Sequence, residues 1–231
     1  MQLRAVLFDV DFTLARPGPE LGGEGYARLG ERYGLRLDPA RYAEAREVAG
    51  RSIKRHPELE HDDEIWVAFT ERIIREMGGG AEGARACAVA MTEAWERAHN
   101  FELYEDALPV LEELRRYELR IALVSNTGRD LDEFVRHHGL DVDVAVGSRA
   151  HGKTKPDPSI FEAALSAVGV PATQAAMVGD SIDDDVNGAV GLGMRGFLLD
   201  RESRHPEFEP RLPNLFALPA ALGLLFDSES Q

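Results

Sequence analysis

Short apolar runs alternate with stretches of helical spacing along most of this chain. The run from Leu3 to Phe8 predicts a buried strand, because a few consecutive apolar residues bounded by polar ones are typical of a strand covered on both faces. Further runs predict strands at Ile121–Val124, Val142–Val146, Ala176–Val178 and Gly196–Leu199. These strands are short enough to form the inner layer of a single sheet.

Between the strands, apolar residues recur every three or four positions, which predicts helices. The expected helices are Leu108–Tyr117, Leu131–His138, Ser159–Val168, Asp185–Val190 and Pro219–Phe226. Alternation of strands and helices implies a parallel sheet with right-handed crossovers. The polar residues Asp227–Gln231 are expected to form a disordered tail.

The pattern changes after the first strand, where residues 16–100 show helical spacing and no convincing strand. Gly18 to Gly25 contains four glycines and predicts a flexible exit from the core. Asp38 and Pro39 are typical of a helix start, and that helix is expected to reach Ala49. Two more helices are predicted, one ending after Met77 at three glycines and one over 81–99.

Two carboxylates follow the first strand directly. Asp9 and Asp11 are one residue apart, at the edge of a parallel sheet where ligands bind. Such a pair can share a divalent cation or divide the roles of nucleophile and acid/base. Alone, the pair is more typical of a solvated turn.

Three other polar groups lie near predicted strand ends. Ser125 and Asn126 follow one strand, and the segment from Asp180 to Asp185 follows another. Lys153 and Lys155 precede a helix that Asp157 is expected to cap. Each piece alone is typical of a turn, but their shared position at strand ends indicates one site.

With these four motifs the chain resembles the haloacid dehalogenase (HAD) superfamily, whose members are mostly Mg-dependent phosphatases. Asp9 and Asp11 match the first motif, Ser125 the second and Lys155 the third. Asp180, with Asp184 or Asp185, matches the fourth. The resemblance covers about residues 1–15 and 101–200.

The resemblance implies an α/β fold, with a HAD-like Rossmann-type core in which helices flank a parallel sheet. Residues 1–15 and 101–231 would form this core. Residues 16–100 would form a helical cap inserted after the first strand, which resembles the C1 caps of the family. Such a cap would close over the site and exclude water.

The resemblance also implies roles in phosphoryl transfer. Asp9 would be the nucleophile that forms an aspartyl-phosphate, and Asp11 would protonate the leaving oxygen. Dehalogenases of the family lack the second acid, so Asp11 favours phosphate esters. Mg²⁺ would be held by Asp9, the backbone carbonyl of Asp11 and Asp180, with support from Asp184 or Asp185.

Phosphate oxygens would be bound by Ser125, Asn126 and Thr13, and Lys155 would offset the negative charge. Lys153 is the alternative lysine. Arg16 is a candidate for binding the rest of the substrate. A basic group in the insert either faces solvent or reaches an anionic substrate tail: Arg51, Lys54, Arg55 and His56.

Two other features are expected to have no role in the site. The segment from His61 to Glu64 is better explained as a charged helix start than as a metal site, and the single cysteine, Cys87, is better explained as an apolar helix residue.

Composition limits the partners. A formal net charge of −15 argues against sequence-independent binding to nucleic acid or an anionic membrane. One cysteine allows no internal disulfide. With no signal-like segment and no apolar stretch of about 20 residues, we expect a cytoplasmic protein.

We therefore predict a Mg-dependent hydrolase that acts on a small phosphorylated metabolite. A phosphomutase shares all of these motifs, and a 2-haloacid dehalogenase-like hydrolase is a second alternative within the superfamily. Outside enzymes, the alternatives are a receiver-like phospho-accepting domain and an inactive binding protein. Receivers are about half as long and carry no helical insert after the first strand, and inactivity would leave a cluster of like charges without a function. The identity of the substrate and the oligomeric state stay open.

Overall fold

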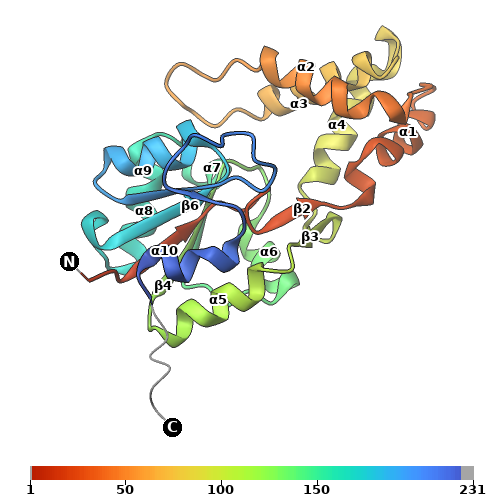
Figure 1. The fold of residues 1–231 in the computed structure, drawn as a ribbon. Helices are drawn as coiled ribbons and strands as arrows, with labels where there is room; N and C mark the ends of the chain where they lie inside the picture. The colour runs from red at the N-terminus through yellow and green to blue at the C-terminus, as the bar shows by residue number, and fades with distance from the viewer. Residues whose placement is uncertain (1, 225–231) are drawn as a thin grey trace.

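A computed structural model describes residues 2–224 of the chain. Its main feature is a parallel sheet of six strands in the order β5-β4-β1-β6-β7-β8, with helices on both faces (Figure 1). The strands are β1 (Ala5–Phe8), β4 (Arg120–Ser125), β5 (Val144–Gly147), β6 (Ala175–Gly179), β7 (Arg195–Leu199) and β8 (Arg211–Leu212). This arrangement confirms the predicted α/β fold.

Strand β1 lies between β4 and β6 and is buried on both faces. Val6 and Phe8 pack into one apolar cluster, whereas Ala5 and Leu7 pack into another, because successive side chains of a strand point to opposite faces. The first cluster is covered by α5 (Ala107–Arg116), α6 (Leu131–His138) and α10 (Leu218–Leu222), and the second by α8 (Pro158–Val168) and α9 (Gly188–Gly191). Burial on both sides explains why the strand reads as an unbroken apolar run.

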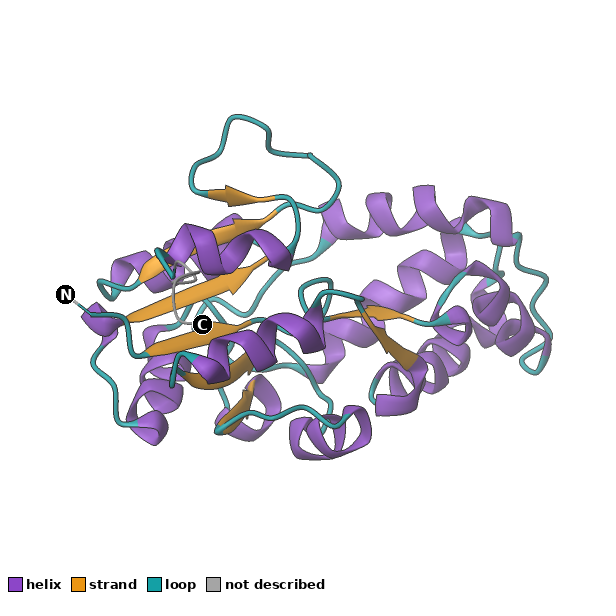
Figure 2. Cartoon of the chain, turned by 60° about the horizontal axis from the view of Figure 1, so that its bottom comes forward, coloured by secondary structure: helices purple, strands orange, loops and turns teal. Residues whose placement is uncertain are grey.

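A helical lobe, seen at the upper right in Figure 1, is inserted between two short strands. Strands β2 (Ala15–Pro17) and β3 (Phe101–Leu103) pair antiparallel and connect it to the core. The lobe contains α1 (Gly23–Glu31), α2 (Tyr42–Ser52), α3 (Asp63–Glu76) and α4 (Ala81–Trp95). We call residues 18–100 the cap. Figure 2 shows it extending from one end of the sheet.

Two expectations for this region were wrong. Arg16 lies in a strand, where none was predicted, because β2 and β3 become neighbours only through tertiary pairing. Gly18 to Gly25 is no flexible exit, since it contains a 3₁₀ turn at Pro19–Leu21 and the first turn of α1. A Cβ on Gly25 would collide with the backbone of Glu20, so this glycine permits close packing.

Other elements differ from prediction mainly at their ends. The helix predicted at Asp185–Val190 begins earlier, as a wide π-type turn at Ile182–Asn187 followed by α9. Helix α10 ends at Leu222, because Gly223 adopts a φ of 82°. Phe226 and the predicted tail lie outside the described residues. The helix predicted from Asp38 to Ala49 begins as a 3₁₀ turn at Pro39–Arg41 and continues as α2, and the end of the helix predicted over 81–99 is a 3₁₀ turn at Ala98–Asn100. Short helical elements that were not predicted are α7 (Ser148–His151) and 3₁₀ turns at Ala172–Gln174 and Leu215–Ala217.

Two smaller predictions are confirmed. The Asp157 side chain accepts a hydrogen bond from the Ser159 N–H and caps α8, with Pro158 at its first position. Cys87 is fully buried on the inner face of α4, and burial raises the pKa of its thiol to about 11. Within residues 2–224, no helix has the length and apolar character needed to cross a membrane.

Candidate active site

The carboxyl ends of three neighbouring strands form the site. Asp9 directly follows β1, Ser125 ends β4 and Asp180 directly follows β6. Because β4, β1 and β6 are parallel neighbours, their carboxyl ends meet at one edge of the sheet. Tertiary pairing thus brings Asp9 next to residues that are more than a hundred positions away in sequence.

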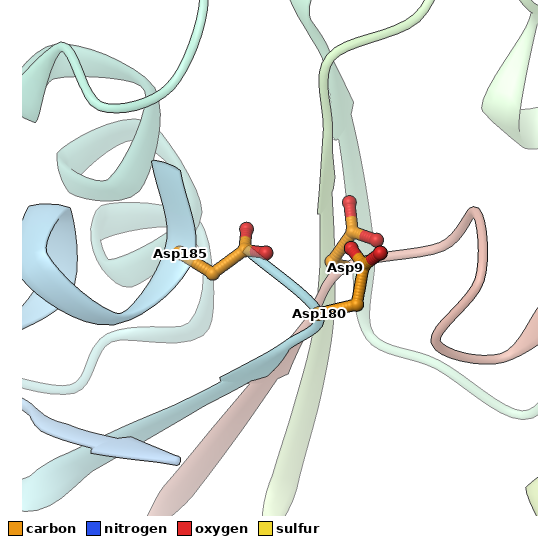
Figure 3. Close-up of side chains that lie close together, drawn as sticks. All are labelled: Asp9, Asp180 and Asp185. Atoms are coloured by element: carbon orange, nitrogen blue, oxygen red, sulfur yellow. The ribbon is translucent and has the colours of Figure 1, made fainter. Parts of the chain in front are cut away.

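Three carboxylates gather at this edge. One oxygen each from Asp9, Asp180 and Asp185 lie within 4.8 Å of one another. In Figure 3, Asp9 and Asp180 project side by side, and Asp185 points toward them from the turn after β6. Gly179 makes room for this turn, because a Cβ there would collide with the Asp185 carboxyl group.

Lys155 is the cation of this cluster. Its Nζ donates to an oxygen of Asp9 and to one of Asp185, each at 2.6 Å, and its side chain is 2% exposed. Burial alone would lower the pKa of Lys155, but the carboxylates of Asp185 and Asp9 outweigh it and raise the pKa. The lysine is therefore held protonated between the two aspartates.

The acids of the cluster carry more charge than one lysine can offset. Burial raises the pKa of Asp9 well above its usual range, although the Lys155 ammonium acts in the opposite direction. Burial and the neighbouring Asp185 also raise the pKa of Asp180, to about 7. If all three carboxylates are ionised, as metal ligation requires, they leave an excess of two negative charges over the single ammonium, and all donors are oxygens. This donor set fits a hard divalent cation.

The structure separates the two candidates for metal support. Asp185 is buried and belongs to the cluster, whereas Asp184 faces Arg55 of the cap and forms an ion pair with it. The two lysines are separated as well, since Lys153 Nζ donates to the Glu58 backbone carbonyl in the cap at 2.7 Å. Geometry thus places Asp185 and Lys155 at the site.

Asp11 is held by a residue that sequence reasoning missed. Nη2 of Arg129 lies 3.0 Å and 3.1 Å from the two Asp11 carboxylate oxygens. The Arg129 side chain is 1% exposed, and its guanidinium carbon lies 3.7 Å from the centroid of the Phe101 ring. Its position four residues after Ser125, in the loop of the second motif, was the signal that could have identified it.

The structure places some of the other predicted phosphate-binding residues at the site and others away from it. Ser125 is buried at the site. The Asn126 side chain accepts from the Lys155 backbone N–H at 2.6 Å and donates to the Lys155 carbonyl at 3.1 Å, so it positions the lysine. Thr13 is fully buried behind the site, and its hydroxyl has no hydrogen-bond partner within the described residues. Arg16 pairs with Glu102 and does not line the cavity described below.

A cavity of about 270 Å³ lies above the carboxylates, between core and cap. The core contributes the residues of the motifs, together with Phe12 and Arg129. The cap contributes Arg46 from α2, Trp66 and Phe69 from α3, and Trp95 from α4. None of these cap residues was singled out from the sequence, because helical spacing alone does not show which face of the cap meets the core.

The histidines take part in local contacts instead. His61 lies 2.8 Å from Ser148 Oγ and 2.7 Å from an oxygen of Asp63. Among residues 2–224, the one group arranged like a metal site is Asp9, Asp180 and Asp185. The segment from His61 to Glu64 therefore forms a helix start, with Asp62 as the cap of α3.

Comparison with known proteins agrees with this geometry. A family model for haloacid dehalogenase-like hydrolases matches residues 3–193. The haloacid dehalogenase-like hydrolase domain-containing protein 3 of Danio rerio is 31% identical, over 95% of this chain and 96% of its own length. A phosphoserine phosphatase of Thermus thermophilus is 38% identical over 62% of this chain and 60% of its own.

Solved structures include a similar 2-haloacid dehalogenase from Pseudomonas syringae. It is 25% identical, with a TM-score of 0.64, over 96% of this chain and 99% of that chain. The overall fold is thus shared with a protein named as a dehalogenase, whereas a sequence relative is named as a phosphatase. Individual side chains have to distinguish among those reactions.

Proposed function

The chain belongs to the haloacid dehalogenase-like hydrolases, and on that premise we propose that it is a Mg²⁺-dependent phosphatase of small phosphomonoesters. The observation that carries the proposal is Asp11, a second carboxylate beside Asp9 that Arg129 holds in place. Hydrolysis of a phosphate ester needs an acid for the leaving oxygen, whereas displacement of a halide needs none. The similarity to a phosphoserine phosphatase supports the same reading.

In the proposed reaction, a carboxylate oxygen of Asp9 attacks phosphorus and the ester P–O bond breaks. Asp11 gives its proton to the departing oxygen, so an alcohol leaves and an aspartyl-phosphate remains. Water then attacks the phosphorus of this intermediate while Asp11 takes a proton from it. Inorganic phosphate leaves, and the Asp9 carboxylate is restored.

The surrounding residues hold the charges of this reaction. The protonated Lys155 stays between Asp9 and Asp185, where it offsets the negative charge of phosphate and nucleophile. Ser125, at the end of β4, is placed to donate a hydrogen bond to a phosphate oxygen. Asn126 keeps the backbone of Lys155 in position.

Asp9, Asp180 and Asp185 would hold the metal ion, and their oxygen donors and excess negative charge fit Mg²⁺. When bound, Mg²⁺ neutralises charge on the phosphoryl group. The substrate we propose is a small phosphorylated metabolite, and the location the cytoplasm. A net charge of −15 supports the exclusion of nucleic acid and anionic membranes as partners.

The test is phosphate release from a panel of phosphomonoesters, with Mg²⁺ and with EDTA. We expect release that depends on Mg²⁺ and is abolished in Asp9→Asn, with circular dichroism showing that the variant is folded. Chloride release from 2-chloropropionate without phosphatase activity would instead assign a dehalogenase. Phosphoryl return to a sugar phosphate in the presence of a bisphosphate primer would assign a mutase.

A further inference from the structure

The cavity above the catalytic carboxylates is lined by four aromatic rings. Phe12 comes from the core, and Trp66, Phe69 and Trp95 come from two helices of the cap. All four are only partly buried, although they belong to the residue types that bury the most apolar surface. Phe69 and Trp95 also pack against the core cluster, whereas Phe12 and Trp66 lie outside both clusters and face the cavity.

The backbone of Phe12 supports this interpretation. Its φ of 65° lies in the left-handed region, which a bulky side chain occupies at a cost and which glycine adopts freely. Phe12 directly follows Asp11, and both residues line the cavity. A strained aromatic residue at such a position indicates a function for the ring.

One cation accompanies the rings. Arg46 lines the same cavity, and its guanidinium carbon lies 5.1 Å from the centroid of the Phe12 ring. Unlike Arg129 and Arg149, which bind carboxylates, Arg46 has no ion-pair partner anywhere in residues 2–224. An arginine left without a carboxylate in a chain of net charge −15 is available for an anionic group on a ligand.

We propose that this half of the cavity binds a flat aromatic ring on the leaving group, and that Arg46 binds an anionic substituent of that ring. The substrate class is then a phosphomonoester of an alcohol that carries an aromatic ring, preferably with a carboxylate. This inference rests on the proposed phosphatase function and makes it specific. Small aliphatic esters such as glycerol phosphate would leave the rings without contacts.

Binding can be measured without turnover, because the only two tryptophans of the chain, Trp66 and Trp95, both line the cavity. Tryptophan fluorescence would be titrated, with Mg²⁺ present, with benzylphosphonate and cyclohexylmethylphosphonate. Neither compound can be hydrolysed, and their rings have the same number of carbons, but only one ring is flat. We expect benzylphosphonate to bind roughly fivefold more tightly, the range of an aromatic pair.

Amino-acid substitutions test the contribution of the aromatic rings and that of Arg46 separately. Phe12→Gly removes a ring and relaxes the backbone, and Trp66→Leu removes another while keeping an apolar side chain. Each should reduce the preference for the flat ring. Phe216→Ala, at an exposed aromatic residue outside the cavity, is the matched control and should keep it. Arg46→Met should weaken binding of 4-carboxybenzylphosphonate roughly tenfold, the range of a charged hydrogen bond, and leave benzylphosphonate unchanged.

Turnover gives the second measurement. kcat/KM for benzyl phosphate should exceed that for cyclohexylmethyl phosphate, whose leaving alcohol is similar in acidity. Equal affinities for the two phosphonates, or a preference that survives both ring variants, would overturn the inference while phosphatase activity on other esters continued. Absence of phosphate release from every ester would refute the proposed function. The phosphonate titration would still show whether the cavity prefers a flat aromatic ring.

Discussion

At the scale of single residues, the central feature is the contact between Asp11 and Arg129. The guanidinium group is buried against the ring of Phe101, and its Nη2 reaches both oxygens of the carboxylate. A charge-assisted pair of this kind fixes the direction of a carboxyl group as well as its position. Arg129 thereby fixes the orientation of the Asp11 carboxyl group at the edge of the cavity.

Asp11→Asn tests this role. Because the amide cannot give or take a proton, turnover of an alkyl phosphate should fall about 10²- to 10⁴-fold. The loss should be much smaller for p-nitrophenyl phosphate, whose leaving group needs little protonation. Steady-state kinetics on both esters is the measurement. Equal losses on the two substrates would contradict the acid role.

At the scale of elements, the loop between α2 and α3, residues 53–62, connects the cap to the segment that carries Lys155. Thr154 N–H donates to the Leu59 carbonyl at 2.8 Å, and His61 N–H donates to the Gly152 carbonyl at 3.0 Å. In Figure 1 this loop reaches from the cap over the core. The cap thus contacts the core through the same segment that carries Lys155 of the candidate site.

Arg55→Ala removes the ion pair between this loop and Asp184. Arg55 is 46% exposed, so we expect a modest effect, with KM raised about two- to fivefold and unfolding free energy changed by less than about 0.5 kcal/mol. The matched control is Arg85→Ala, which removes an exposed ion pair with Glu64 within the cap. The same KM change in both variants would show that the loop contact has no part in substrate binding.

Asp143, just before β5, gives a prediction for pH. Its carboxylate accepts the Ile121 N–H at 2.8 Å and contacts Arg115 and Arg120. Burial acts to raise the pKa of Asp143, but these hydrogen bonds together lower it. A lowered pKa in the folded state adds stability above the unfolded value, near 3.9, and this stability is lost as pH falls through the folded pKa.

Asp143→Asn should therefore reduce the free energy of unfolding by about 1 kcal/mol at pH 7. The difference from the wild type should shrink as pH falls from 5 toward 3. Urea unfolding of both proteins at several pH values is the measurement. A difference that stays constant over this range would show that the charge of Asp143 is not what stabilises the fold.

At the scale of the whole molecule, an acidic chain concentrates three of its carboxylates at one sheet edge. The sheet holds them together through the apolar clusters on its two faces, against their mutual repulsion. Lys155 offsets only part of this repulsion, so without a metal ion it lowers the stability of the folded state. Binding of Mg²⁺ to the folded state alone should restore it by mass action.

Asp180→Asn should consequently raise the melting temperature of the protein in EDTA and remove most of the further rise caused by Mg²⁺. For the wild type, Mg²⁺ at a hundred times its Kd should add about 2.7 kcal/mol. Differential scanning calorimetry with and without Mg²⁺ is the measurement. Asp183→Asn, at an aspartate that contacts Asn187 outside the cluster, is the control and should behave like the wild type.

The sequence by itself determined the fold class and most residues of the candidate site. Apolar runs as short as Ala5–Phe8 are predictable because burial on both faces requires an unbroken apolar strand. The residues at the ends of such strands are then predictable as a group, since parallel strands bring their carboxyl ends to one edge. Asp9, Ser125 and Asp180 follow from this rule, and Asp11 and Lys155 from the resemblance to the family.

Only the tertiary structure decided the contacts between segments that local pattern does not connect. It placed Asp185 in the carboxylate cluster, whereas Asp184 pairs with Arg55. It also placed Lys155 on Asp9, whereas Lys153 donates to the backbone of Glu58 in the cap. It also placed Arg129 on Asp11 and four aromatic rings around one cavity. Sequence spacing shows which residues share a helix face, but the packing of cap against core determines what that face meets.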